Sequence, residues 1–241
     1  MHVAAGAGSH YVSDGYLRRW DVTVGAPLGP PIQAHNGYVH FLSRILLRGR
    51  EVLVTYGPPG MLKIWRPADG ALLAEIATGI SSKVTGFAAG LVDGRPFVAL
   101  SSYRQPMRLH ALEDSTENPI TIPEAGNGVV LGIVGSHIVA GHFEHERMGL
   151  HTIRMWNISG RKVGPDIRGE AEVTTVAGRT LPTAYIGRAD GTVSLTDLVT
   201  GRDLCNPCRL PSRPRAMTVT DSGDLVVGFG SDLARIRPPV P

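Results

Sequence analysis

Long apolar runs are missing from this sequence of 241 residues. No stretch approaches the ~18 consecutive apolar residues that a membrane-spanning helix needs. The first residues carry neither the basic region nor the apolar region of a secretory signal. No window repeats apolar residues about every 3.6 positions, as an amphipathic helix does. These absences predict a cytoplasmic chain without membrane contact and with almost no helix.

Cysteine is scarce as well, because Cys205 and Cys208 are the only two. So few cysteines fit a reducing compartment, where disulfides are not needed to hold a fold together. Their Cys-x-x-Cys spacing can form half of a zinc site or a redox couple. A second such pair is absent, so the favoured interpretation is that both cysteines fill space near an outer strand.

Neither sign of charge dominates the chain, since the formal net charge is +3, and aromatic residues make up only 6%. Arginine is frequent near the C-terminus, at Arg202, Arg209, Arg213, Arg215, Arg235 and Arg237. No aromatic residues alternate with these arginines, so nucleic acid is not an expected partner. Neither a phosphate-binding loop nor a Gly-x-Ser-x-Gly elbow occurs, and an enzyme is not expected either.

Histidine and glutamate are concentrated in one short segment, at His142, Glu144, His145 and Glu146, with His151 shortly after. Such residues can gather around a divalent metal such as zinc. Neither His-Glu-x-x-His nor His-x-x-Glu-His is present, and the segment is predicted to be a hairpin loop rather than a helix. We therefore expect a solvated loop, with metal binding as the alternative, and no metal or cofactor for the protein.

Turn-forming residues and a long repeat are what the sequence does contain. Glycine (30) and proline (18) are frequent, as dense turns between short strands require. A pattern of an apolar, a basic and an apolar residue before tryptophan, or before a residue in its place, recurs six times. Its last positions are Trp20, Trp65, His110, Trp156, Thr196 and Arg237, which lie 40 to 46 residues apart. This period is typical of a four-stranded β-propeller blade. The sequence thus predicts an all-β chain, a β-propeller of about six four-stranded blades in a single domain (1–241).

Strand-like runs divide each repeat into four, with glycine and proline between them. In the second repeat the predicted strands are residues 38–46, 51–56, 61–65 and 71–77. The first repeat begins at its second strand (2–5) and the last stops after its third (233–237). The first and last blades are therefore expected to be incomplete, with 22 strands where six full blades need 24. Unpaired edges of this kind also predict possible self-association.

The aligned repeats resemble WD-repeat propellers over almost the whole chain. The resemblance is carried by Asp14-Gly15 to Trp20-Asp21, by His35 to Trp65, and by Asp190-Gly191 to Thr196-Asp197. The spacers at residues 23–31 and 92–100 are similar to the repeat style of actinobacterial WD proteins.

In that family, each blade is held by a tetrad of His, Ser/Thr, Asp and Trp. The resemblance assigns His35, Thr55 and Trp65 to the second repeat, where Pro58-Pro59-Gly60 replaces the Asp. In the first repeat it assigns Ser13, Asp14 and Trp20. Trp156 has no evident His or Asp partner in the sequence.

The resemblance implies a non-catalytic scaffold that binds a protein or peptide on one rim of the propeller or at its central opening. The predicted contacts, from loops on that side, are Tyr56, Tyr103, Arg104, His145 and Arg188. Tyr and Arg are favoured because they carry much of the energy of interfaces. Two alternatives remain open. One is a propeller hydrolase or lyase with a site at the channel mouth, and the other is a regulatory fragment of a larger protein.

Overall fold

The computed structural model describes residues 2–9, 12–21, 24–80, 82–103, 105–114, 116–123, 128–143, 149–180 and 182–237, with only the backbone for residues 2–9, 12–14 and 130. These residues form β-strands and turns, and none lies in an α-helix. Within the described ranges, no helix is long and apolar enough to cross a membrane.

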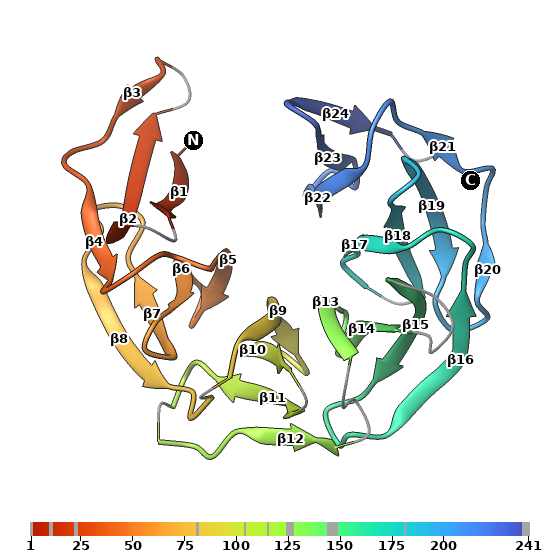
Figure 1. Cartoon of the computed structure of the whole chain (residues 1–241), viewed down its shortest axis with the longest axis horizontal. Helices are drawn as coiled ribbons and strands as arrows, with labels where there is room; N and C mark the ends of the chain where they lie inside the picture. The colour runs from red at the N-terminus through yellow and green to blue at the C-terminus, as the bar shows by residue number, and fades with distance from the viewer. Residues whose placement is uncertain are drawn as a thin grey trace. The chain divides into compact units, whose positions relative to one another are not determined.

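The strands form six antiparallel sheets in chain order (Figure 1). The first two sheets contain β1 (His2–Ser9), β2 (Val12–Asp21), β3 (Ala26–Pro27) and β4 (Ile32–His35), then β5 (Phe41–Leu47), β6 (Arg50–Gly57), β7 (Met61–Trp65) and β8 (Leu72–Ala77). The third and fourth contain β9 (Val84–Val92), β10 (Arg95–Ser102), β11 (Gln105–Ala111) and β12 (Ile120–Ile122), then β13 (Gly128–Val134), β14 (His137–Phe143), β15 (Leu150–Trp156) and β16 (Lys162–Arg168). The last two contain β17 (Val173–Ala177), β18 (Thr183–Arg188), β19 (Thr192–Asp197), β20 (Arg202–Asp203) and β21 (Cys208–Arg209), then β22 (Pro214–Val219), β23 (Leu225–Phe229) and β24 (Asp232–Ile236).

Contacts divide the chain into two compact units. Unit 1 comprises residues 1–83 and 110–119, and unit 2 comprises residues 84–109 and 120–241. Unit 1 holds the first and second sheets, and unit 2 holds the fourth, fifth and sixth and most of the third. The expectation of a single domain stays a prediction.

The fold class predicted from the repeat is confirmed: the chain is an all-β, six-bladed β-propeller. In the first sheet β3 and β4 both pair with β2, so four short strands occupy three positions, and the last sheet has three strands. β20 and β21 likewise share one edge of β19. These two divided outer edges explain why the described residues form 24 strands in the 22 positions expected.

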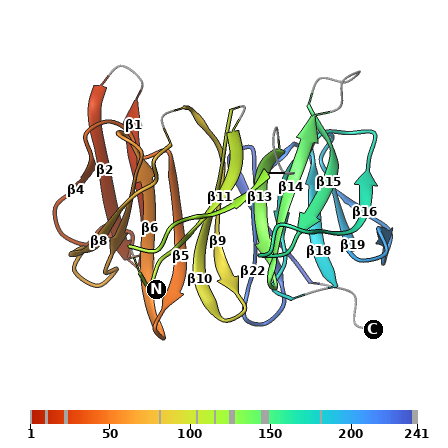
Figure 2. The same ribbon diagram turned by 90° about the horizontal axis from the view of Figure 1, so that it is seen from below.

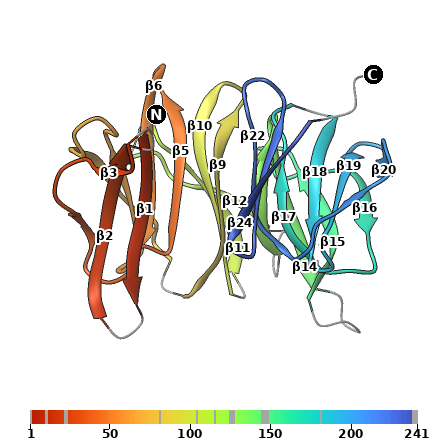
Figure 3. The ribbon, with the colours of Figure 1, turned by 90° about the horizontal axis from the view of Figure 1, so that it is seen from above.

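Antiparallel neighbours follow directly from the short turns, because a two-residue or three-residue turn returns the chain alongside itself. Figure 2 shows β13, β14 and β15 side by side within the fourth sheet. Figure 3 shows the same arrangement for β18 and β19 in the fifth sheet. Alternate residues of each strand therefore point to the same face, which is why apolar residues at every second position form a core.

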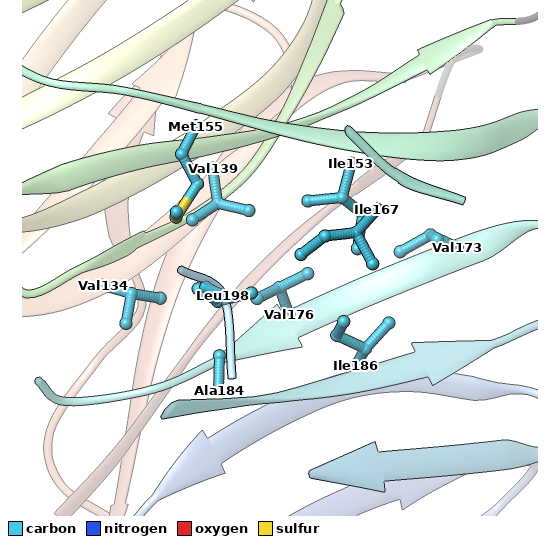
Figure 4. Packing of buried hydrophobic residues seen from close by; sticks show 10 residues of the cluster. All are labelled: Val134, Val139, Ile153, Met155, Ile167, Val173, Val176, Ala184, Ile186 and Leu198. Atoms are coloured by element: carbon cyan, nitrogen blue, oxygen red, sulfur yellow. The ribbon is translucent and has the colours of Figure 1, made fainter. Parts of the chain in front are cut away.

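One part of the core of unit 2 lies between the fourth and fifth sheets. Side chains of β14, β15 and β16 lie opposite those of β17 and β18, as Figure 4 shows for Met155 and Ile153 on one side and Val176 and Ile186 on the other. Ile153 and Ile186 are completely buried. Burying each such side chain contributes about 1.5–3 kcal/mol. Unit 1 has its own cluster, which includes Leu17, Leu53 and Trp65.

Three local predictions needed correction. The second repeat's first strand begins at Phe41, so residues 38–40 belong to the preceding loop. In the fifth repeat the sequence predicts an outer strand at residues 203–210, but this edge is interrupted between β20 and β21, in a segment where Pro207 has no N–H to donate to a ladder. His142, predicted on a loop, lies on β14 and is buried.

Candidate functional site at the rim ends of the sheets

Three side chains of unit 1 form a buried hydrogen-bonded chain. The Thr55 hydroxyl accepts a hydrogen bond from Nε1 of Trp65 at 2.9 Å and lies 2.8 Å from Nε2 of His35. All three residues are buried. These are the contacts that the WD-repeat resemblance implied for the second repeat, although the turn after β6 carries no aspartate. The arrangement ties one sheet to the next within unit 1.

The backbone explains how these residues meet. His35 ends β4 in the first sheet, whereas Thr55 and Trp65 lie on β6 and β7 of the second. Gly57 makes room for the imidazole, because a Cβ there would lie 2.6 Å from the His35 ring. Burial, together with the positive charge of Lys63, lowers the pKa of His35 from 6.5 to about 4. His35 is therefore neutral at pH 7.

Replacing Thr55 with valine is expected to lower the free energy of unfolding by about 2 kcal/mol. The shape is nearly unchanged, but two buried ring nitrogens lose their common partner. Urea denaturation measures the loss. Thr55→Ser keeps the hydroxyl and is expected to lose less than about 1 kcal/mol. A loss with Thr55→Ser but none with Thr55→Val would show that the methyl group, and not the hydrogen bonds, stabilises this position.

In the fourth sheet a histidine also lies beside the tryptophan, but it comes from a different strand than in the second sheet. His142 on β14 lies beside Trp156 of β15, with 5.2 Å between the ring centroids. The strand registers place His142 where Gly57 stands in the second sheet. The imidazole is therefore supplied by the second strand of the same sheet, and not by the last strand of the preceding sheet as for His35. This partner was not predicted from the sequence, although the alternation Ile138, Ala140, His142 puts it on the face of Trp156.

Lysine and arginine in the recurring pattern form ion pairs within their sheets. Lys63 lies 2.8 Å from Glu75 on the outer strand β8, and Arg154 lies 2.9 Å from Asp166 on β16. In the last sheet, which has three strands among the described residues, Nε of Arg235 donates to Asp224, the residue before β23, at 2.7 Å. These contacts indicate a structural role for the repeated cation, rather than a ring of positive charge for a ligand.

The first repeat gives a less complete picture. Ser13 and Asp14 lie on β2, where only the backbone is described, so their predicted tetrad roles are not tested. Trp20 lies on the same strand, opposite Val3, and is half-buried. It takes the register position of Trp65 without the same degree of burial.

The predicted partner contacts differ in their placement. Tyr103 is 62% exposed, whereas Tyr56 is only 5% exposed and packs beside Phe41 with 6.4 Å between ring centroids. The burial of Tyr56 argues against a direct contact with a partner. Arg188 is half-buried at the end of β18. Arg104 and His145 lie outside the described residues.

We use the term rim end for the end of a sheet at which its first strand begins and its second strand turns into its third. Tyr38, His40 and Phe41 gather at the rim end of the second sheet and are all half-buried. The ring centroids of Tyr38 and His40 are 4.0 Å apart, and those of His40 and Phe41 are 6.1 Å apart. These residues were predicted to lie within a strand, so this aromatic group was not expected from the sequence.

The cysteines and the remaining histidines show no metal centre in the described part of the chain. Cys205 and Cys208 are both unpaired and half-buried. Cys208 packs against the apolar cluster formed by Tyr185 and Val227, and burial raises the pKa of its thiol. Among the residues that the structure describes, no group of three or more His, Cys, Asp or Glu side chains is placed to hold a metal ion.

Comparisons with known proteins agree with this fold. No family model and no curated protein matches the sequence. Among solved structures, the chain is similar to the WD40 repeats of RRP9, with 17% identity over 96% of this chain and 70% of that one and a TM-score of 0.69. It is similar to U3-55K, with 16% identity over 96% of this chain and 71% of that one and a TM-score of 0.69.

The chain is also similar to the computationally designed Ika8 protein, with 19% identity and a TM-score of 0.63. The match covers 95% of this chain but only 65% of the designed protein. At these identities the likeness shows the fold alone. The chain is thus a β-propeller that resembles WD40-repeat structures.

Proposed function

We propose that this chain is a divergent WD-repeat protein that acts as a non-catalytic scaffold and binds a protein or peptide partner at the rim ends of its sheets. The fold supports this proposal, because WD40-like propellers commonly serve as interaction scaffolds. A fold alone does not specify a function, so the proposal must be supported by the residues exposed on the surface.

The observation that carries the proposal is the aromatic group at the rim end of the second sheet. Tyr38, His40 and Phe41 present partly exposed rings side by side. Aromatic residues are enriched in the centres of protein interfaces, because they bury a large area at a small cost in conformational entropy. In unit 2, Tyr103 adds a 62% exposed ring at the rim end of the third sheet.

The buried histidines support a structural use of the imidazoles. His35 is bonded to Thr55, and His142 packs on Trp156. Both are held neutral by burial inside the sheets.

We also propose a cytoplasmic location, which the two unpaired cysteines support, since thiols stay reduced there. Self-association through unpaired strand edges stays a prediction of the strand count.

Capture of partners from the native lysate by the full chain tests this proposal. We expect a defined partner that is retained by wild type and lost with Tyr38→Ala or Tyr103→Ala. The matched control is Leu73→Ser, which removes an exposed side chain (48% exposed) on the outer strand β8. Failure to capture any stoichiometric partner, or equal loss with the control, would contradict a scaffold that binds at the rim ends.

A further inference from the structure

Three loop segments meet at the rim end of the fifth sheet in unit 2. They are residues 169–172 before β17, residues 189–191 between β18 and β19, and residues 210–213 between β21 and β22. The amide of Ala189 donates to the carbonyl of Glu172 at 2.7 Å, and the amide of Leu210 donates to the carbonyl of Gly191 at 2.9 Å. Strand β22 lies beside β17 (Figure 1). These segments therefore form one continuous surface.

Four arginines occupy this surface, and we call them the arginine group: Arg188, Arg209, Arg213 and Arg215. Arg188 is held firmly, because its Nη1 donates to the carbonyl of Ala171 at 3.2 Å. Its guanidinium also fills the space that a side chain at Gly169 would need, with 2.0 Å between that Cβ position and Nη1. Burial lowers the pKa of Arg188 below its usual value, but a guanidinium stays charged at pH 7.

The carboxylates nearby are already engaged. Glu172 lies 3.6 Å from Nη2 of Arg213. Asp190 accepts hydrogen bonds from the amide and the hydroxyl of Thr192, at 3.0 and 2.8 Å. Arg209 and Arg215 are exposed, and within the described residues neither makes a hydrogen bond or an ion pair. Two guanidinium groups of the arginine group therefore keep hydrogen-bond donors for a ligand, although the charge of Arg209 also acts on the Asp190 carboxylate.

A cavity of about 330 Å³ opens between these arginines and is lined by Thr174, Arg213, Pro214 and Arg215. One wall is rigid, because the Thr174 hydroxyl donates to the carbonyls of Pro214, at 2.8 Å, and Gly187, at 3.2 Å. The volume is near the lower end of the ~300–1,000 Å³ range of small-molecule sites. It suits a single side chain better than a large ligand.

We propose that the arginine group binds an acidic segment of the partner protein, with one Asp or Glu side chain entering the cavity between Arg213 and Arg215. A neighbouring carboxylate of the same segment pairs with Arg209. Arginine is suited to this task, because its planar guanidinium donates two parallel hydrogen bonds to a carboxylate. This inference rests on the proposed scaffold function and adds the chemistry of the partner.

A peptide is favoured over a nucleic acid by the lining of the cavity. Thr174, Arg213, Pro214 and Arg215 supply no aromatic ring on which a base would stack, and stacking carries much of the binding of single strands. We therefore expect the ligand to be a carboxylate-bearing peptide. An oligonucleotide is tested as the alternative ligand.

Fluorescence anisotropy with the full chain tests the inference. The probe is a labelled peptide of alternating Glu and Gly, and the same peptide with Gln in place of Glu is the reference. We expect wild type to bind the Glu peptide and to bind the Gln peptide at least about 10-fold more weakly, since each charge-assisted hydrogen bond lost costs about 1.5–3 kcal/mol. Binding of the Glu peptide should weaken as salt is raised.

Arg215→Gln is expected to weaken binding of the Glu peptide about 10-fold, because it removes one wall of the cavity. Arg215 is exposed, so the variant should fold normally, which circular dichroism and thermal melting check. The matched control is Arg202→Gln, since Arg202 is an exposed arginine at the opposite end of the fifth sheet. The control should bind like wild type.

Three results would overturn the inference: equal binding of the Glu and Gln peptides, equal weakening by Arg202→Gln and Arg215→Gln, or tighter binding of a single-stranded oligonucleotide with the same dependence on Arg215. The lysate capture separates this failure from failure of the scaffold function. If a partner is lost with Tyr38→Ala but retained by Arg215→Gln, the proposed scaffold function stands. The proposal of an acidic ligand is then rejected.

Discussion

Replacing Trp65 with alanine is expected to lower the free energy of unfolding by about 3–5 kcal/mol. The indole is only 3% exposed and packs in the cluster with Leu17, Ala34 and Leu53. Its removal leaves a cavity in unit 1 and deprives the Thr55 hydroxyl of its donor. Equilibrium unfolding in urea, followed by circular dichroism, measures the change.

Trp20 provides the matched control for this experiment. It occupies the same register position in the first sheet but is half-buried, so Trp20→Ala should cost clearly less than Trp65→Ala. A loss below about 1 kcal/mol for Trp65→Ala would contradict the packing described for unit 1. Equal losses for the two variants would mean that burial does not decide the contribution of the recurring tryptophan.

Acidification is expected to destabilise the fold between about pH 7 and pH 4 through His35 and His142. Burial, helped by Lys63 for His35 and by Arg154 for His142, lowers each pKa from 6.5 to about 4. In this window the unfolded chain binds a proton on each imidazole that the folded chain does not bind. The stabilisation is therefore fully present above pH 6.5 and is lost as the pH falls towards 4.

Each histidine is expected to contribute about 2 kcal/mol of lost stability between pH 7 and pH 5. Urea denaturation at a series of pH values measures the slope, and His142→Gln should reduce it by about half. The control is Leu73→Ser, which removes an exposed side chain and leaves every imidazole in place, so its slope should match that of wild type. A slope that is the same in wild type and His142→Gln would show that other groups cause the acid sensitivity.

Part of the candidate site was predictable from the sequence because it follows the repeat. His35, Thr55 and Trp65 take the positions that the WD-repeat resemblance assigns, and they bond as that resemblance implies. The His142–Trp156 pair was missed, because the second strand of the fourth sheet was expected to end before His142. Its actual bounds, His137–Phe143, put His142 inside the ladder.

The aromatic group and the arginine group were likewise not predictable from the sequence. Tyr38 and His40 were read as strand residues because their apolar character continues into β5, although the ladder begins at Phe41. Arg188, Arg213 and Arg215 come from loops and strand ends that are about 25 residues apart in the chain, between positions 188 and 213. Only contacts such as Arg213 with Glu172 reveal that they share one surface.

The sequence by itself determined the period of the chain, the alternation of apolar residues and the places of its turns, because these depend on residues close together along the backbone. They were sufficient for an all-β propeller with incomplete first and last sheets. Tertiary structure alone decided which side chains meet. Register across strands sets the neighbours of each residue, and a shift of one position moves a side chain to the opposite face. That is why the neutral His142 beside Trp156, the buried Tyr56 and the cavity between Arg213 and Arg215 appear only when the sheets are assembled.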